Sequence, residues 1–319
     1  MKFFTLIPSN PNIDFIGKFK YFFAFSIIAL MAVLWGLYSK GLNLGVDFTG
    51  GTVIQVKFQS PQTAETVRKL VLELGDQEAS VVALGTENQE YLITSRNHES
   101  KTQGSAPQPL SQKLTQKLGS EIQILSVDVV GPKVGADLKK AAILSLVYSV
   151  LLIAAYIWLR FDFRFAPGAT LAMLHDLIMA TGFYLITGKE FTITAIAALL
   201  TIAGYSVNDT IVIYDRVREM TKLSGNAMPL AETINKAINL TLSRTVLTAT
   251  LTLISVIPIA IFCSGEIQSF AIAIAFGILV GIYSTVYIAS PFTIYVADFL
   301  EKREQKQGGH GTRPAKAKA

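Results

Sequence analysis

The sequence predicts an α-helical polytopic membrane protein with six transmembrane helices and one α+β domain of ferredoxin-like order between the first and second helix. Hydrophobic residues make up 51% of the 319 residues and charged residues only 16%, and the mean hydropathy is +0.44. These proportions are typical of a chain that lies largely in lipid. Six apolar runs are long enough to cross a bilayer, and one polar stretch, residues 41–138, separates the first run from the others.

The apolar runs define the expected spans. The first run lacks a small-residue cleavage site of the A-x-A type, so we expect it to stay as a span and not to be removed as a signal peptide. The expected spans are residues 21–38, 141–159, 166–186, 191–214, 240–262 and 270–296. They divide the chain into 1–40 (N-terminus and first span), 41–138 (exported domain), 139–300 (spans two to six) and 301–319 (disordered cytoplasmic tail).

Lysine and arginine residues gather on one side of these spans. Short segments rich in Lys and Arg stay in the cytoplasm, whereas long domains cross the membrane largely regardless of charge. We therefore expect both termini to be cytoplasmic and residues 41–138 to lie on the outer face. The basic residues on the cytoplasmic side are Lys18, Lys20, Arg160, Arg164, Arg216, Arg218, Lys222, Lys236, Lys302 and Arg303.

The exported segment alternates strand patterns with helix patterns. Its strand segments alternate β-branched and polar side chains, and its helix segments are amphipathic, the first opened by Pro61 and closed by Gly75. The segments in order are strand 51–58, helix 61–75, strands 80–84 and 91–95, helix 110–118 and strand 121–130. This βαββαβ order predicts one sheet backed by two helices.

The composition argues against several classes of function. The net charge is +5 and the isoelectric point about 9.1, but the basic residues flank apolar runs and form no basic face with interleaved aromatics, so we expect no nucleic-acid partner. The lone cysteine, Cys263, allows no disulfide within the chain, and no Cys/His group has the spacing of metal ligands. We expect no enzyme activity, no metal and no cofactor.

Four ionisable residues inside the spans are the candidate functional residues, because such side chains are costly in lipid. His175 and Asp176 lie near the middle of the third span, Asp209 lies in the fourth, and Arg244 begins the fifth. Helix rise places Asp209 and Arg244 at similar depth, so we expect them to pair. A carboxylate beside a guanidinium keeps its charge, whereas an isolated carboxyl in an apolar environment takes a proton, so the pair would form a switchable proton site.

A structural interpretation of the same residues stays open. Asp209 and Arg244 would then form a static ion pair that orients the helices, supported by hydrogen bonds from Ser206, Asn208 and Thr210. Asp176 would bond hydroxyls on a neighbouring span, and His175 would be a packed polar residue.

A glycine-containing motif stands just after the first span. Gly50 and Gly51 allow a tight turn before the first strand, while Asp47 and Thr49 can bond nearby backbone, and Phe48 lies between them. We interpret the motif as a rigid junction. A phosphate-binding loop is disfavoured, because no Lys-Ser/Thr follows and no helix starts there.

Five strings together resemble the SecD/SecF family of bacterial protein-export membrane proteins, a branch of the proton-driven RND transporter superfamily. They are VDFTGG at 46–51, GPKVG at 131–135, LHD at 174–176, GYSVNDTIVIYDRVRE at 204–219 and SRT at 243–245. The similarity runs from the first span to the last, and it is closer to the smaller of the two subunits of the family.

The resemblance implies a place for this chain in protein export. In the family, the acidic residue of the fourth span and the arginine of the fifth belong to the proton pathway, which here means Asp209 and Arg244. His175 and Asp176 match the third-span motif of the family. A SecD partner would supply a second, pseudo-symmetric six-span half, and the pair would associate with the SecYEG channel in the bacterial inner membrane. It would act on an unfolded translocating polypeptide after SecA has begun transport, with the proton gradient as energy source; whether YidC joins stays open.

Two other functions are alternatives to this one. A small-molecule or lipid exporter of the RND superfamily usually has two exported domains and two halves in one chain, whereas this chain has one of each. An intramembrane aspartyl protease would use Asp176 and Asp209 to activate a water molecule. That family requires a G-x-G-D string, which is absent here, and Arg244 would suppress the proton that such a dyad shares.

Overall fold

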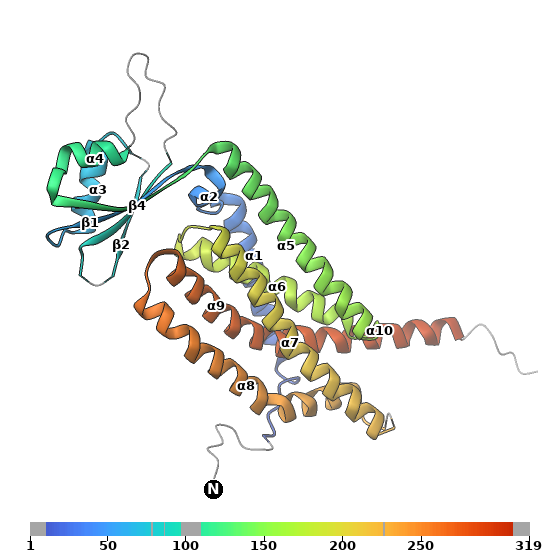
Figure 1. Ribbon diagram of the computed structural model, residues 1–319. Coiled ribbons are helices and arrows are strands. Elements are labelled where there is room, and N and C mark those ends of the chain that lie inside the picture. The colour runs from blue at the N-terminus through green and yellow to red at the C-terminus, as the bar shows by residue number, and fades with distance from the viewer. Residues whose placement is uncertain (1–10, 78, 86, 97–109, 226, 309–319) are drawn as a thin grey trace, which may run out of the picture.

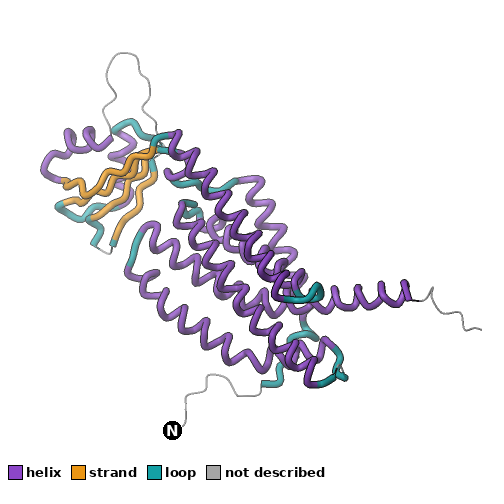
Figure 2. Tube along the Cα trace, turned by 45° about the vertical axis from the view of Figure 1, so that its right-hand side comes forward, coloured by secondary structure: helices purple, strands orange, loops and turns teal. Residues whose placement is uncertain are grey.

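The computed structural model describes residues 11–77, 79–85, 87–96, 110–225 and 227–308, and in these it has six helices long and apolar enough to cross a membrane. Figure 1 shows a small domain beyond one end of the helix bundle, and Figure 2 shows that all its strands lie in this domain. The spanning helices are α1 (Phe19–Lys40), α5 (Pro132–Arg160), α6 (Ala166–Thr187), α7 (Ile193–Leu223), α8 (Leu230–Phe262) and the segment from α9 to α10 (Gly265–Gln305). The predicted fold class is confirmed.

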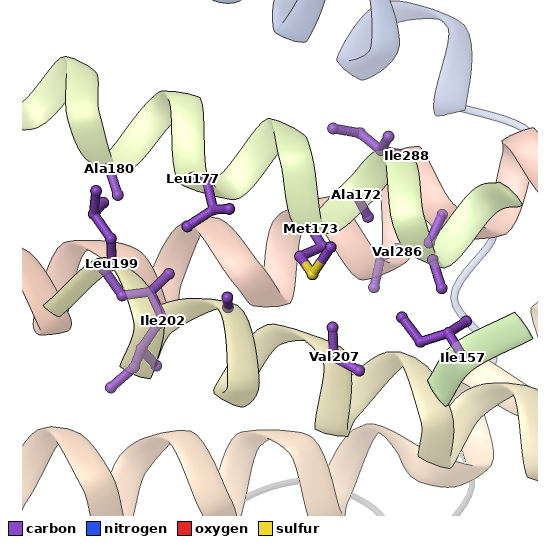
Figure 3. Packing of buried hydrophobic residues seen from close by; sticks show 14 of the residues in the cluster. Ile157, Ala172, Met173, Leu177, Ala180, Leu199, Ile202, Val207, Val286 and Ile288 are labelled. Carbon is purple, nitrogen blue, oxygen red and sulfur yellow. The ribbon is translucent and has the colours of Figure 1, made fainter. Parts of the chain in front are cut away.

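The bundle has a buried centre and a lipid-facing periphery. More than half of the most apolar stretch of α6, of α7 and of α9–α10 is buried, whereas α1, α5 and α8 bury only a small share of theirs. Figure 3 shows the centre, where Met173 and Leu177 of α6 lie over Ile202 and Val207 of α7. Small residues allow this packing: a Cβ on Gly277 of α9 would stand 2.4 Å from Ile202.

Several helices are longer than the apolar runs that predicted them. Polar turns extend α7 to Leu223, and α8 begins at Leu230. The last span changes from α9 (Gly265–Ser284) through a π-helical turn (Thr285–Ala289) into α10 (Ser290–Gly308). Because α10 continues to Gly308, the first part of the predicted tail 301–319 is helical, and residues 309–319 lie outside the described residues.

The domain has the predicted βαββαβ order. Its elements are β1 (Gly51–Phe58), α3 (Ala64–Glu73), β2 (Ser80–Leu84), β3 (Glu90–Ser95), α4 (Leu110–Leu118), a short 3₁₀ turn (Gly119–Glu121) and β4 (Ile122–Val130). The sheet order is β2-β3-β1-β4 with every neighbouring pair antiparallel. This is the ferredoxin-like arrangement, in which α3 and α4 cover one face.

Alternate side chains of the strands form the core of the domain. Ile54 of β1 and Ile93 of β3 are fully buried and face Val67 of α3 and Leu114 of α4. The hydroxyl of buried Tyr91 donates to the carbonyl of Gln62 at 2.6 Å, so the polar end of the ring is satisfied.

We predict that Ile93→Ala lowers the free energy of unfolding of the domain by about 2–5 kcal/mol, because it leaves a cavity in this core. Hydrogen exchange of the β1 and β3 amides in the full-length protein would measure the loss. The matched control is Val129→Ala on β4, where the side chain is 71% exposed and the expected change is within about 0.5 kcal/mol. Equal effects of the two substitutions would contradict the core assignment.

Candidate functional site

Asp176, at the centre of the bundle, makes three side-chain hydrogen bonds. It is completely buried on α6, and its two oxygens accept hydrogen bonds from two other helices as well as its own. Ser206 of α7 and Ser284 of α9 both donate to Oδ2, the latter at 2.7 Å, and His175 Nδ1 lies 2.9 Å from Oδ1. The structure thus confirms that Asp176 bonds hydroxyls of neighbouring spans.

A small residue lets the donors approach. Gly281 stands one helical turn before Ser284, and a Cβ at that position would lie 3.3 Å from Ser206 Cβ. Small residues at contacts between spans allow close approach of the backbones. The contact between α7 and α9 is therefore close enough for one carboxylate oxygen to accept from both.

His175 is buried beside Asp176, but its second ring nitrogen makes no hydrogen bond. Only 3% of the residue is exposed, and Nε2 has no partner among the described residues. The ring lies 6.4 Å from the ring of Tyr283, whose hydroxyl bonds the carbonyl of Phe22 at 2.6 Å and lies 2.7 Å from Ser26 Oγ. His175 thus stands between the bonded carboxylate and the side of α1.

Asp209 is also buried, but among the described residues its carboxyl lacks the hydroxyl donors that Asp176 has. It is 3% exposed on α7, and its Oδ2 has no hydrogen-bond partner in the described part of the chain. Arg244 is close enough to act on it electrostatically, yet no salt bridge joins the two side chains among the described residues. The predicted Asp209–Arg244 ion pair is therefore not formed in this structure.

The reason is the rotation of α8. Its buried stripe includes Thr241, Thr245 and Ala249, and Arg244 lies about 100° away from Thr245 around the helix, on the exposed face. Asn208 is likewise exposed, so in this structure it does not support an Asp209–Arg244 pair inside the bundle. The other two supporting residues, Ser206 and Thr210, are buried as expected.

The two buried carboxyls are not hydrogen-bonded to each other in the described part of the chain. The described hydrogen bonds of Asp176 go to His175, Ser206 and Ser284, and none joins it to Asp209. An aspartyl protease needs two carboxyls that share a proton, which requires them to be adjacent. Among the described residues, no group of three or more His, Cys, Asp or Glu could hold a metal ion.

The glycine-containing junction connects the domain to α7. Residues Val46–Thr49 form a short helix, α2, and the carboxylate of Asp47 accepts a hydrogen bond from the backbone N–H of Ile193 at 3.0 Å. Ile193 is the first residue of α7, so Asp47 satisfies one of the free N–H groups at the start of that helix. The sequence alone did not indicate this partner.

The remaining residues of the junction fix its shape. Gly50 and Gly51 have φ of 74° and 147°, which confirms the expected turn, and a Cβ on Gly51 would meet the carbonyl of Ser95 at 2.4 Å. Thr49 Oγ1 donates to the carbonyl of Gly45 at 3.1 Å, and Phe48 is buried beside Phe191.

A second contact between the domain and the bundle is formed by charged side chains. Arg96, just after β3, donates to Asn43 Oδ1 at 2.6 Å and lies 4.0 Å from Glu190 in the α6–α7 loop. Burial raises the pKa of Glu190 above its ordinary value of 4.5; the Arg96 guanidinium opposes this rise, and the nearby carboxylates of Glu266 and Asp47 add to it.

Comparison with known proteins places the whole chain in one group. A family model described as "Protein export membrane protein SecD/SecF, C-terminal" matches residues 110–298, and one described as "SecD/SecF GG Motif" matches residues 35–62. The protein translocase subunit SecF of Calditerrivibrio nitroreducens is 40% identical over 95% of this chain and 99% of that protein. The subunit SecF of Thermodesulfovibrio yellowstonii is 37% identical over 90% of this chain and 96% of that protein.

A solved structure has the same fold. The crystal structure of SecDF from Thermus, described as a translocon-associated membrane protein, superposes with a TM-score of 0.80 at 33% identity. The superposition covers 92% of this chain but only 40% of that one. A second structure, SecDF in a super-membrane-facing form, gives a TM-score of 0.69 at 32% identity.

We predict that Glu190→Gln flattens the pH dependence of stability at the contact between domain and bundle. Because burial raises the pKa of Glu190, its contribution to stability is present below pH 4.5 and is lost as the pH rises through the raised value. Glutamine stays neutral throughout, so the variant should be the more stable protein at neutral pH.

Hydrogen exchange of the residues around Arg96, measured between pH 4 and pH 8, would show the difference. Glu87→Gln serves as the control, because Glu87 is exposed. An unchanged pH profile in Glu190→Gln would refute the prediction.

Proposed function

This chain belongs to the SecD/SecF family of protein-export membrane proteins, and from that premise we propose that, together with a SecD subunit, it uses the proton motive force to promote polypeptide translocation across or into the bacterial inner membrane. The observation that carries the proposal is the pair of buried carboxyls, Asp176 and Asp209, on neighbouring helices of the bundle. Ionisable groups at that depth are costly and typical of proton pathways.

Asp209 is the residue that exchanges the proton. Its Oδ2 has no hydrogen-bond partner among the described residues, while Arg244 acts on it without a salt bridge. A shift of Arg244 toward the carboxylate favours the charged form, and a shift away favours the protonated form. Asp176, by contrast, is held by its hydrogen bonds, so it serves as the fixed second site of the pathway with His175 beside it.

Helix α7 transmits the change to the exported domain. It carries Asp209, and its first residue, Ile193, is bonded by Asp47 of the junction. A shift of α7 on protonation therefore moves the segment that leads into β1. One elementary charge that crosses 100 mV supplies about 2.3 kcal/mol, which changes the ratio of two states roughly 50-fold.

The SecD subunit covers an exposed stripe of α7. The stripe consists of Ala197, Thr201, Gly204 and Asn208, and Arg244 of α8 is exposed as well. Small and polar residues are typical of contacts between spans, whereas the exposed residues of α5 are mainly large and apolar. The partner half would thus complete the surroundings of Asp209 and Arg244.

The remaining features of the proposal concern topology and partners. The distribution of Lys and Arg favours cytoplasmic termini and a domain on the outer face, where it would contact the emerging unfolded polypeptide. The complex associates with the SecYEG channel, with YidC as a further candidate partner. The chain would act as a transport subunit, in line with relatives that are named protein translocase subunit SecF, and the proposal needs no cofactor besides the proton gradient.

We predict that Asp209→Asn abolishes proton-dependent export while it leaves the complex with SecD intact, because asparagine cannot bind and release a proton. Export into inverted membrane vesicles with and without a proton gradient would measure the loss. Glu219→Gln is the matched control on the same helix, since Glu219 is exposed, pairs with Arg216 at 2.7 Å and should retain most activity. Full export by Asp209→Asn would refute the proton role.

We also predict that a cysteine at Thr201 cross-links to SecD, whereas one at Leu151 does not. Thr201 lies on the polar stripe of α7, and Leu151 is 58% exposed on the apolar face of α5. The only native cysteine is Cys263, so both variants are made in a Cys263→Ser background. Cross-linking at Leu151 but not at Thr201 would place SecD against α5 and contradict the prediction.

A further inference from the structure

A row of buried hydroxyl groups leads away from Asp176 along the contact between α7 and the last span. After Ser206 and Ser284, which donate to Asp176, come Thr210 and Thr285, whose Oγ1 atoms lie 3.0 Å apart. The next pair is the hydroxyl of Tyr214 and Oγ1 of Thr293, 2.7 Å apart. All six residues with these hydroxyls are at most 2% exposed.

The row has a regular spacing and a clear end. On α7 its residues stand four positions apart, at 206, 210 and 214, so successive pairs are about 6 Å apart and the row is about 12 Å long. It ends at Tyr214, next to Asp215, which forms an exposed salt bridge with Arg160 at 2.8 Å. One end of the row is thus a buried carboxylate and the other adjoins the charged end of the bundle.

The opposite side of the row is formed by the π-helical turn. This turn, Thr285–Ala289, contributes Thr285 and the carbonyl of Ala289, which accepts from Tyr214 at 3.1 Å and from Thr293 at 2.9 Å. Ser290 donates to the carbonyl of Thr285 at 2.9 Å. Short π-helical turns are uncommon and occur frequently at functional sites, because they realign side chains and carbonyls that an α-helix would turn away.

Helix α6 closes the row tightly at the Tyr214 end. A Cβ on Gly168 would stand 2.5 Å from Thr293 Oγ1 and 2.7 Å from both the Tyr214 hydroxyl and the Ala289 carbonyl. The rings of Phe161 and Phe165 pack against Tyr214 at 5.6 Å and 5.1 Å. These contacts leave the last pair of hydroxyls fully buried, with Tyr214 and Thr293 both 0% exposed.

We propose that this row of hydroxyls conducts protons between Asp176 and the end of the bundle at Asp215, with the π-helical turn as its movable part. The inference rests on the proposed proton-driven function and adds a route to it. At each step a hydroxyl oxygen accepts one proton and releases its own to the next acceptor, so no net charge stays on the row. One water molecule between successive pairs would bridge a gap of about 6 Å with two hydrogen bonds.

The alternative is that the hydroxyls only hold the helices together, as such groups do between spans. The two roles differ in what they require. A structural role needs size and packing, which Thr285→Val and Tyr214→Phe preserve, whereas conduction needs the hydroxyl itself. Thr285→Ser is the rescue variant, because it keeps the hydroxyl and loses only a methyl group.

The test is proton influx into vesicles that contain the full complex with SecD, followed with a trapped pH-sensitive dye under an imposed gradient. We expect Tyr214→Phe and Thr285→Val each to lower the influx about tenfold, equivalent to about 1.4 kcal/mol in the barrier, and Thr285→Ser to stay within about twofold of the unmodified protein. Co-purification with SecD shows that each variant assembles.

Each outcome decides a separate question. Influx that depends on Asp209 but is unchanged in Tyr214→Phe contradicts the row and leaves the proposed function standing. Influx that does not depend on Asp209 contradicts the proposed function itself. If the Thr285→Val variant does not assemble with SecD, the influx of Tyr214→Phe decides whether the row conducts protons, because this substitution removes one oxygen and keeps the ring.

Discussion

The burial of the Asp176 carboxylate is the constraint on which the membrane half of this protein depends. A carboxyl group removed from water must be hydrogen-bonded, and here its partners come from three helices: His175 of α6, Ser206 of α7 and Ser284 of α9. The same three helices bury more than half of their apolar stretches. Small residues such as Gly281 stand where the helices approach, so packing and polar bonding require the same close contact.

Helix α7 connects the buried Asp176 to the glycine-containing junction and to the exposed polar stripe. Its first residue is bonded by Asp47 of the junction, its middle holds Ser206 and Asp209, and Tyr214 lies near its charged end. The opposite face of the helix is small, polar and exposed. One helix therefore contacts the junction that leads into the βαββαβ domain, carries one of the buried carboxyls and presents the surface that we propose for SecD. A shift of that helix would affect all three.

The sequence was sufficient for the spans, the βαββαβ order and the burial of Asp209, because hydropathy and periodicity determine these features. It was insufficient for the pairing of Asp209 with Arg244 and for the position of Asn208. Depth along a helix follows from the sequence, but the rotation of one helix against another depends on the packing of all of them. Ser284 and Tyr214 were missed because single hydroxyls are common in spans; the spacing of four residues along α7 was the available signal.

The proposed coupling is that protonation of the buried carboxyl of Asp209 on α7 moves the βαββαβ domain. Its most direct test is the distance between labels at Glu87 in the domain and Thr187 at the end of α6, both exposed, measured by electron spin resonance in vesicles that contain the complex with SecD. We expect an imposed proton gradient to shift the distance distribution of the unmodified protein and to leave that of Asp209→Asn unchanged. The same shift in both proteins, or a shift in neither, would contradict it.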